Sequence, residues 1–194
     1  NICNNEKVFI LHLLSKCINT TPLKGLKAIQ GFRETERKQW SEENAAVLNR
    51  VRALAFGARL HDALPHVHVL DLAAAGHIKP HVDAVRVSHG TAVNICLLSS
   101  RSVQFCGDVI AGLCLVSSAV MQLAHCENKH MKVNALLQRR ALYIMTGVAR
   151  YDFTHAVLGG AESVWRGASL PRQRRVALVC RMRPRPQDAP SGDQ

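Results

Sequence analysis

A histidine and an aspartate stand two residues apart in the segment "KPHVDAV", at His81 and Asp83. In a β-strand, residues at this spacing project to the same side, so an imidazole and a carboxylate would share one face. Two imidazoles and one carboxylate can hold Fe(II) and still leave coordination positions open. The pair is a weak indicator by itself, because the chain has 10 histidines and the spacing arises easily by chance. A strand-end pair with no metal is the alternative.

Downstream residues extend this pair into an ordered set. The segment "RYDFTHAV" has a strand-like composition and contains a further histidine, His155, and the following basic segment "RRVALVCR" contains Arg175 and Arg181. An arginine offers a permanently charged, two-pronged partner for a carboxylate. The order therefore predicts an iron site followed by basic residues that bind the distal carboxylate of a dicarboxylic cosubstrate. An ordinary charge on an edge strand remains the alternative for Arg181.

Short apolar runs supply the elements that would position these residues. From His66 onward each run is bounded by Gly, Pro, Ser, Asn or charged residues, which favours antiparallel strands. Several such strands with one helix in front predict a mainly β (α+β) domain, a double-stranded β-helix or jelly roll covered on one face. The runs are "HVHVLDL", "VIAGLCLVS", "VMQLAH", "ALYIMTG" and "RVALVCR".

One helix is predicted between Ser41 and Gly57. Ser41 is placed as the N-cap, and the two glutamates that follow suit the positive end of the helix dipole. An apolar face for packing is formed by Val47, Leu48, Val51, Leu54 and Ala55.

Composition limits the other classes of function. A chain of 194 residues fits one domain that buries about 70% of its unfolded surface. The dense apolar run at 8–14 is too short to span a bilayer, so no transmembrane segment is expected. The net charge of +11 would favour nucleic acid, but much of it lies in "LPRQRR" and in the C-terminal tail, so direct binding is not favoured. Seven cysteines without a CxxC pair indicate buried thiols in a reducing compartment.

Five segments, in order, resemble the AlkB family of Fe(II)/2-oxoglutarate dioxygenases, and within it the mitochondrial branch. They are "GFRETERKQWSE", "VHVLDLAAAGHIKPHVD", "FCGDVIAGLCLVSSAVMQLAH", "LYIMTGVARYDFTH" and "RRVALVCR", and they cover about residues 30 to 86 and 105 to 183. The resemblance implies Fe(II) as metal and 2-oxoglutarate as cosubstrate. The iron ligands that it implies are His81, Asp83 and His155. The cosubstrate contacts that it implies are Tyr143, Arg175, Val176, Ala177 and, as a second basic contact, Arg181.

The resemblance further implies a dioxygenase of the mitochondrial matrix that takes 2-oxoglutarate and oxygen and oxidises a protein or small substrate. It also implies roles in regulated necrosis, through mitochondrial permeability, and in fatty-acid metabolism. Two alternatives stay open: a demethylase of mitochondrial RNA, including tRNA, and a catalytically silent interaction protein on the same scaffold. Nucleic-acid-repairing members carry an Asn-x-Tyr pair where this chain has Leu70 to Leu72, and aromatic residues total only 5%. A base-stacking lid is therefore not expected.

One segment departs from the family pattern. "VDAVR" should run almost directly into "FCGDVIAG", yet residues 87–104, "VSHGTAVNICLLSSRSVQ", intervene. Val-Ser can be encoded by GTGAGC and Gln by CAG, so we interpret the segment as a retained intron or an isoform-specific loop. His89 within it is not expected to bind the metal, because a fourth protein ligand would fill an open position. The expected organisation is an unassigned segment 1–28, a dioxygenase domain 29–183 and a disordered tail 184–194.

Overall fold

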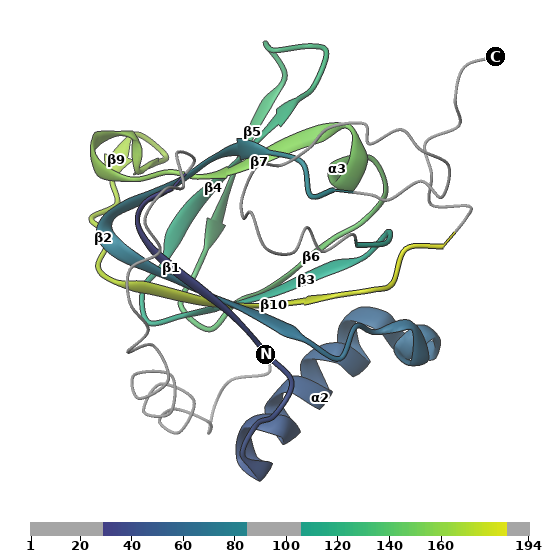
Figure 1. Ribbon diagram of the computed structural model, residues 1–194. Coiled ribbons are helices and arrows are strands. Elements are labelled where there is room, and N and C mark those ends of the chain that lie inside the picture. Colours follow the sequence, from purple (N-terminus) through teal and green to yellow (C-terminus); the bar gives the residue numbers. More distant parts are fainter. Residues whose placement is uncertain (1–28, 85–105, 186–194) are drawn as a thin grey trace, which may run out of the picture.

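The protein is built on one strongly curved antiparallel sheet that nearly closes into a barrel (Figure 1). The computed structural model describes residues 29–84 and 106–185. The main sheet runs in the order β5-β4-β7-β2-β10-β3-β6, and β1 pairs with β2 beside this path. Its strands are β1 (Ile29–Arg37), β2 (Val67–His81), β3 (Ile110–Leu115), β4 (Ala119–His125), β5 (Lys132–Leu137), β6 (Leu142–Met145), β7 (Phe153–Val157) and β10 (Arg175–Arg181). The predicted jelly-roll class is confirmed.

The remaining elements are short, apart from one helix. They are α2 (Glu42–Phe56), η1 (Gly57–Asp62), α3 (Gly147–Tyr151), η2 (Gly160–Glu162) and a separate hairpin of β8 (Val164–Trp165) and β9 (Ala168–Ser169). Among the described residues, no helix has both the length and the apolar character needed to cross a membrane.

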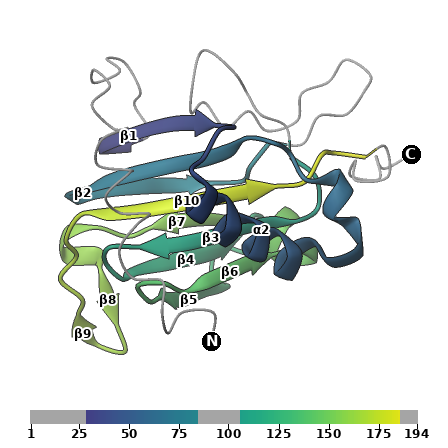
Figure 2. The ribbon, with the colours of Figure 1, turned by 90° about the horizontal axis from the view of Figure 1, so that it is seen from below.

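The side chains of strand β10 alternate between a hydrophobic cluster on one face of the sheet and a pocket on the other. Val176, Leu178 and Cys180 pack with residues of α2 in the largest hydrophobic cluster. Residues Val179 and Arg181, which point to the opposite face, line a pocket inside the barrel. Figure 2 shows α2 lying across this outer face of the sheet. The helix therefore closes one side of the sheet, and the other side is left for the pocket.

Helix α2 begins and ends where its sequence signals predict. The Ser41 hydroxyl accepts a hydrogen bond from the backbone N–H of Asn44 at 3.4 Å, and Gly57 follows the last turn with a φ of 52°. Leu48 and Val51 are buried as expected, but Leu54 is 56% exposed. Leu54 lies at the margin of the apolar stripe, and Phe56 is buried at the end of the helix instead.

All five apolar runs form strands, whereas β1 and β5 were not predicted from their polar sequences. Strand β1 is stabilised by its partner: it pairs with β2 along most of its length. Segment 1–28, the intervening residues 87–104 with His89, and most of the expected disordered tail lie outside the described residues. Arg185, at the start of that tail, forms an ion pair with Asp108 at 3.0 Å.

Candidate metal and cosubstrate site

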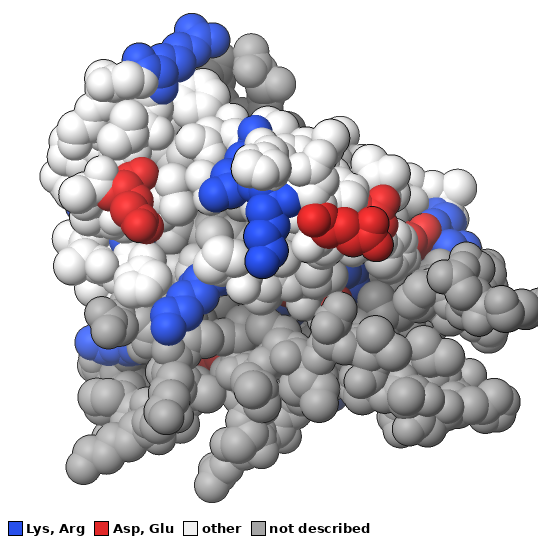
Figure 3. All heavy atoms as spheres, turned by 90° about the horizontal axis from the view of Figure 1, so that it is seen from above, with Lys and Arg blue, Asp and Glu red and all other residues white. Residues whose placement is uncertain are grey.

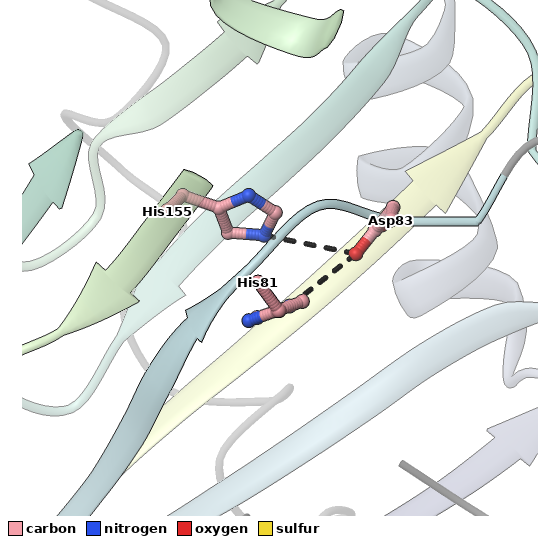
Figure 4. A group of neighbouring side chains, drawn as sticks. All are labelled: His81, Asp83 and His155. Carbon is pink, nitrogen blue, oxygen red and sulfur yellow. Dashed lines mark ion pairs between the residues drawn. The ribbon is translucent and has the colours of Figure 1, made fainter. Parts of the chain in front are cut away.

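Two histidines and an aspartate meet at one end of the barrel (Figure 4). Strand pairing places His81 of β2 directly opposite His155 of β7, with ring centroids 4.1 Å apart. Asp83 follows the end of β2, and its Oδ1 lies 3.4 Å from His81 Nε2 and 3.6 Å from His155 Nε2. One ligand atom from each residue falls within 4.8 Å of the others. In the described part of the chain, no other group of three His, Cys, Asp or Glu residues has this proximity.

The surroundings of the two imidazoles orient both rings toward Asp83. His81 Nδ1 donates to the carbonyl oxygen of Lys79 at 2.9 Å, and its Nε2 is turned toward Asp83 Oδ1 at 3.4 Å. Burial, helped by the nearby charge of His81, lowers the pKa of His155 to about 3, so this ring is neutral in the physiological range. Neutral imidazole is the form that binds metals.

Asp83 completes the group as an ionised carboxylate. Burial alone would raise its pKa, but the charge of Arg181 and a hydrogen bond from His81 outweigh burial and hold the pKa well below its usual range. Arg181 directs both Nε and Nη2 to Oδ2, each at 3.0 Å. Oδ1 therefore remains turned toward the two imidazoles. Two imidazoles and one carboxylate fit Fe(II).

Arg175 of β10 forms the deep wall of the same pocket. Its side chain is buried, with 1% exposed, and Nε donates to Cys114 Sγ at 3.3 Å. Nη1 is buried without a hydrogen-bond partner among the described residues, and no described carboxylate forms an ion pair with this guanidinium. Leaving a buried charged donor unsatisfied is costly. The arrangement fits a carboxylate of a bound ligand.

Tyr143 of β6 lies beside Arg175 in the pocket. Burial raises the pKa of its hydroxyl, and the charge of Arg175 offsets this only in part, so the group stays neutral and can donate a hydrogen bond. Its strand partner on β3 is Gly112, and a Cβ atom at that position would collide with the Tyr143 ring. Sequence reasoning missed Gly112, although a glycine within the apolar run "VIAGLC" indicates a close approach of another group.

Not every residue expected at the cosubstrate site lies there. Ala177 is on the same face of β10 as Arg175 but is not among the residues that line the pocket. Val176 points to the other face and packs in the cluster beneath α2. Successive strand residues point to opposite faces, so Val176 is turned away from the pocket, and its contact with the cosubstrate stays a prediction. Arg181 lines the pocket, but the contacts that it makes are with Asp83 and His68.

Two further polar residues of the pocket were not predicted, His68 of β2 and Glu34 of β1. His68 could have been found from the sequence, because it alternates with Leu70 and Leu72 in "HVHVLDL" and so points to the same face of the strand as these leucines. Glu34 had none, because its position depends on the pairing of β1 with β2. The apolar part of the wall comes from Leu70, Ile78, Ile110, Met121, Val157 and Val179.

Comparison with curated proteins identifies the family. The chain is 44% identical over 157 residues to a Bos taurus protein named alpha-ketoglutarate-dependent dioxygenase alkB homolog 7, mitochondrial. It is 43% identical over 169 residues to the Mus musculus protein of the same name. The chain belongs to the AlkB family. These matches cover 81% and 84% of this AlkB chain but 62% of the bovine and 68% of the mouse protein, so it spans about two thirds of their length.

Solved structures support the same fold for this AlkB chain. The structure of OsALKBH1 superposes with a TM-score of 0.56 at 13% identity, covering 89% of each chain. A Pseudomonas putida prolyl-4-hydroxylase superposes with a TM-score of 0.51 at 12% identity, covering 90% of this chain and 85% of its own. No family model matches the sequence. AlkB-type dioxygenases use Fe(II) and alpha-ketoglutarate, that is, 2-oxoglutarate, and the donor set and the buried Arg175 fit both groups.

Proposed function

We propose that the protein is an Fe(II)- and 2-oxoglutarate-dependent dioxygenase that oxidises a protein or a small molecule in mitochondria. One observation supports the proposal most directly: a single pocket is lined by His81, Asp83 and His155 and by the buried Arg175. The Nη1 atom of this arginine has no hydrogen-bond partner among the described residues. The names of the bovine and mouse relatives support the reaction and the mitochondrial location. Roles in regulated necrosis and fatty-acid metabolism, implied by the resemblance, belong to the same proposal.

The residues of the chain divide the work in a simple way. His81, Asp83 and His155 would hold the iron, and Arg175 and Tyr143 would hold the distal carboxylate of 2-oxoglutarate. When bound, the iron activates oxygen as 2-oxoglutarate loses carbon dioxide and becomes succinate. The neutral Tyr143 hydroxyl would donate to the carboxylate, while Arg175 would supply the opposite charge. The apolar wall of the pocket excludes water around these polar contacts.

The preference for a protein or small substrate over a nucleic acid is supported by the described segment between α2 and β2 and by the distribution of basic side chains. Between α2 and β2, where every residue is described, the chain contributes only η1 and a short connection, and this segment forms no aromatic and basic lid to receive a flipped base. On the face shown in Figure 3, the described Lys and Arg side chains form separate groups rather than one continuous basic surface. RNA demethylation remains the second candidate, favoured by the net charge of +11.

Anaerobic spectroscopy of the full chain tests the proposal. Fe(II) with 2-oxoglutarate should give a weak visible charge-transfer band, and turnover without substrate should release succinate. His155→Ala should lose both signals, and Arg175→Leu should require far more 2-oxoglutarate. Arg174→Leu is the matched control, because its guanidinium is half-exposed and pairs with Asp71 instead. The absence of band and succinate in the unsubstituted protein would leave the silent interaction protein as the reading.

For the second candidate, the expected result is a weak shift of RNA that follows only the total positive charge. Tight RNA binding abolished by substituting pocket residues, with release of formaldehyde from methylated RNA, would favour the demethylase instead.

A further inference from the structure

The two oxygens of Asp83 have different surroundings. Oδ1 faces His81 and His155, whereas Oδ2 accepts from Arg181 and has the Cys106 thiol 4.0 Å away. Burial raises the pKa of Cys106 to about 11, so the thiol keeps its proton and can donate weakly to Oδ2. This asymmetry presents a single oxygen to a metal, and Arg181 is its main cause.

Arg181 is itself held by a second pair of side chains. Its Nη1 donates to His68 Nδ1 at 2.9 Å. A guanidinium only donates, so Nδ1 must be the acceptor and the ring proton must lie on Nε2. His68 Nε2 then donates to Glu34 Oε2 at 3.1 Å. One hydrogen-bond direction thus runs from Arg181 through His68 to Glu34.

We propose that His68 and Glu34 are positioning residues for the metal site: they fix Arg181 so that Asp83 offers only Oδ1 to the metal. The inference rests on the proposed function, since it concerns the same metal ligand. It adds two residues with no hydrogen bond to His81, Asp83 or His155, which act on the site through Arg181.

Burial explains why Arg181 needs this support. The side chains of Arg181, His68 and Glu34 are only 13%, 16% and 13% exposed, so water cannot readily replace a lost contact. Without His68, Nη1 would be left with no acceptor at a nearly buried position, and a long side chain with several rotatable bonds would gain alternative positions. Asp83 would then be free to turn both oxygens toward the metal.

Glu34 links this arrangement to the strand outside the main path of the sheet. Strand β1 pairs with β2, and Glu34 lies opposite Leu70, so it reaches His68 diagonally across the two strands. A change at Glu34 should therefore act only through the orientation of His68, and its effect should be smaller than that of a change at His68.

Mn(II) binding by the full metal-free chain, measured from the free-ion electron paramagnetic resonance signal, tests the inference without requiring turnover. His68→Leu should weaken binding by about tenfold, the lower end of the range for residues that support metal ligands. Glu34→Ala should weaken it less. Glu34→Gln should bind nearly as the unsubstituted protein does, because the amide oxygen still accepts from Nε2–H.

Asp71→Asn is the matched control. Asp71 is a buried carboxylate on β2 that pairs with Arg174 at 2.8 Å, outside the pocket. This variant should lower the melting temperature and leave the Mn(II) dissociation constant unchanged. His68→Leu and Glu34→Ala binding Mn(II) as tightly as the control would overturn the inference.

The outcomes separate the two proposals. If the unsubstituted chain binds no Mn(II), the metal site itself fails. If it binds Mn(II) and both His68→Leu and Glu34→Ala bind equally well, only the positioning role fails. Should His68→Leu not fold, the comparison of Glu34→Ala with Glu34→Gln decides the matter. The inference is supported if Glu34→Ala binds Mn(II) more weakly than Glu34→Gln does, and it is refuted if the two variants bind Mn(II) equally well.

Discussion

Substituting Gly112 with alanine is expected to impair binding of 2-oxoglutarate selectively. A Cβ atom at residue 112 would collide with the ring of Tyr143, its partner on β6. The collision involves the ring itself, which cannot bend away as the end of a flexible side chain can. Either the ring must turn out of the pocket, or the β3–β6 pairing must open.

The magnitude follows from the contact that is lost. A hydrogen bond to a charged group is worth about 1.5–3 kcal/mol, which corresponds to a rise in the KM for 2-oxoglutarate of about 10- to 150-fold. Overpacking at this buried position should also lower the free energy of unfolding by about 1–3 kcal/mol. The metal ligands lie on other strands, so Mn(II) affinity should not change.

The assay measures the KM for 2-oxoglutarate from succinate release and Mn(II) affinity for Gly112→Ala, Tyr143→Phe and the double variant. If alanine acts by displacing the Tyr143 hydroxyl, the double variant should have a KM no higher than the worse single variant. The reasoning is wrong if Gly112→Ala folds with a KM within twofold of the unsubstituted protein. It is equally wrong if metal affinity falls as much as cosubstrate affinity.

Three further predictions concern the same pocket and its border. The pKa of His155 is depressed to about 3, so its contribution to folding is complete above the unfolded pKa of about 6.5 and is lost as the pH falls. The metal-free chain should thus lose about 2 kcal/mol between pH 8 and pH 5 in urea unfolding, and an equal loss in His155→Gln would contradict this. Arg175→Lys should raise the KM for 2-oxoglutarate about tenfold or more, because a lysine lacks the second prong; an unchanged KM would argue against a carboxylate at this position. Cys106 N donates to Ala84 O at 3.0 Å, so the two ends of the intervening segment lie next to each other. Deletion of 87–104 should therefore leave the Mn(II) affinity unchanged, and it should lower the entropic cost of loop closure by about 1.7 kcal/mol. A deletion variant that folds but no longer binds Mn(II) would show that the segment supports the site.

Local signals in the sequence were sufficient for the elements that contain them. Helix α2 could be bounded from Ser41 and Gly57, because a capping hydroxyl and a terminal glycine act within one turn of the chain. Strand β10 was visible from its apolar run. Strand β1 was not, because "IQGFRETER" is mostly polar and its strand state depends on pairing with a segment some forty residues away.

The candidate site divides in the same way. His81 and Asp83 could be connected by their spacing, but the approach of His155 needed the register of β2 against β7. The strand-like segment around His155 and the family resemblance both suggested that residue, and the pairing gives the physical reason. Resemblance also placed Val176 beside Arg175, and strand alternation separates them. Adjacent residues of a strand point to opposite faces, so they do not line the same pocket.

The position of β2 explains why so much depends on its register. It pairs with β1, β10 and β7, and so brings His68 next to Arg181 at one end and His81 next to His155 at the other. Because side chains alternate, a slip of β2 by one residue would move His68 and Leu70 to the helix side and bring Val67 and Val69 into the pocket. The buried valines beneath α2 resist such a slip, since they would lose their packing with the helix. The hydrophobic cluster on one face of the sheet therefore fixes the geometry of the polar group on the other.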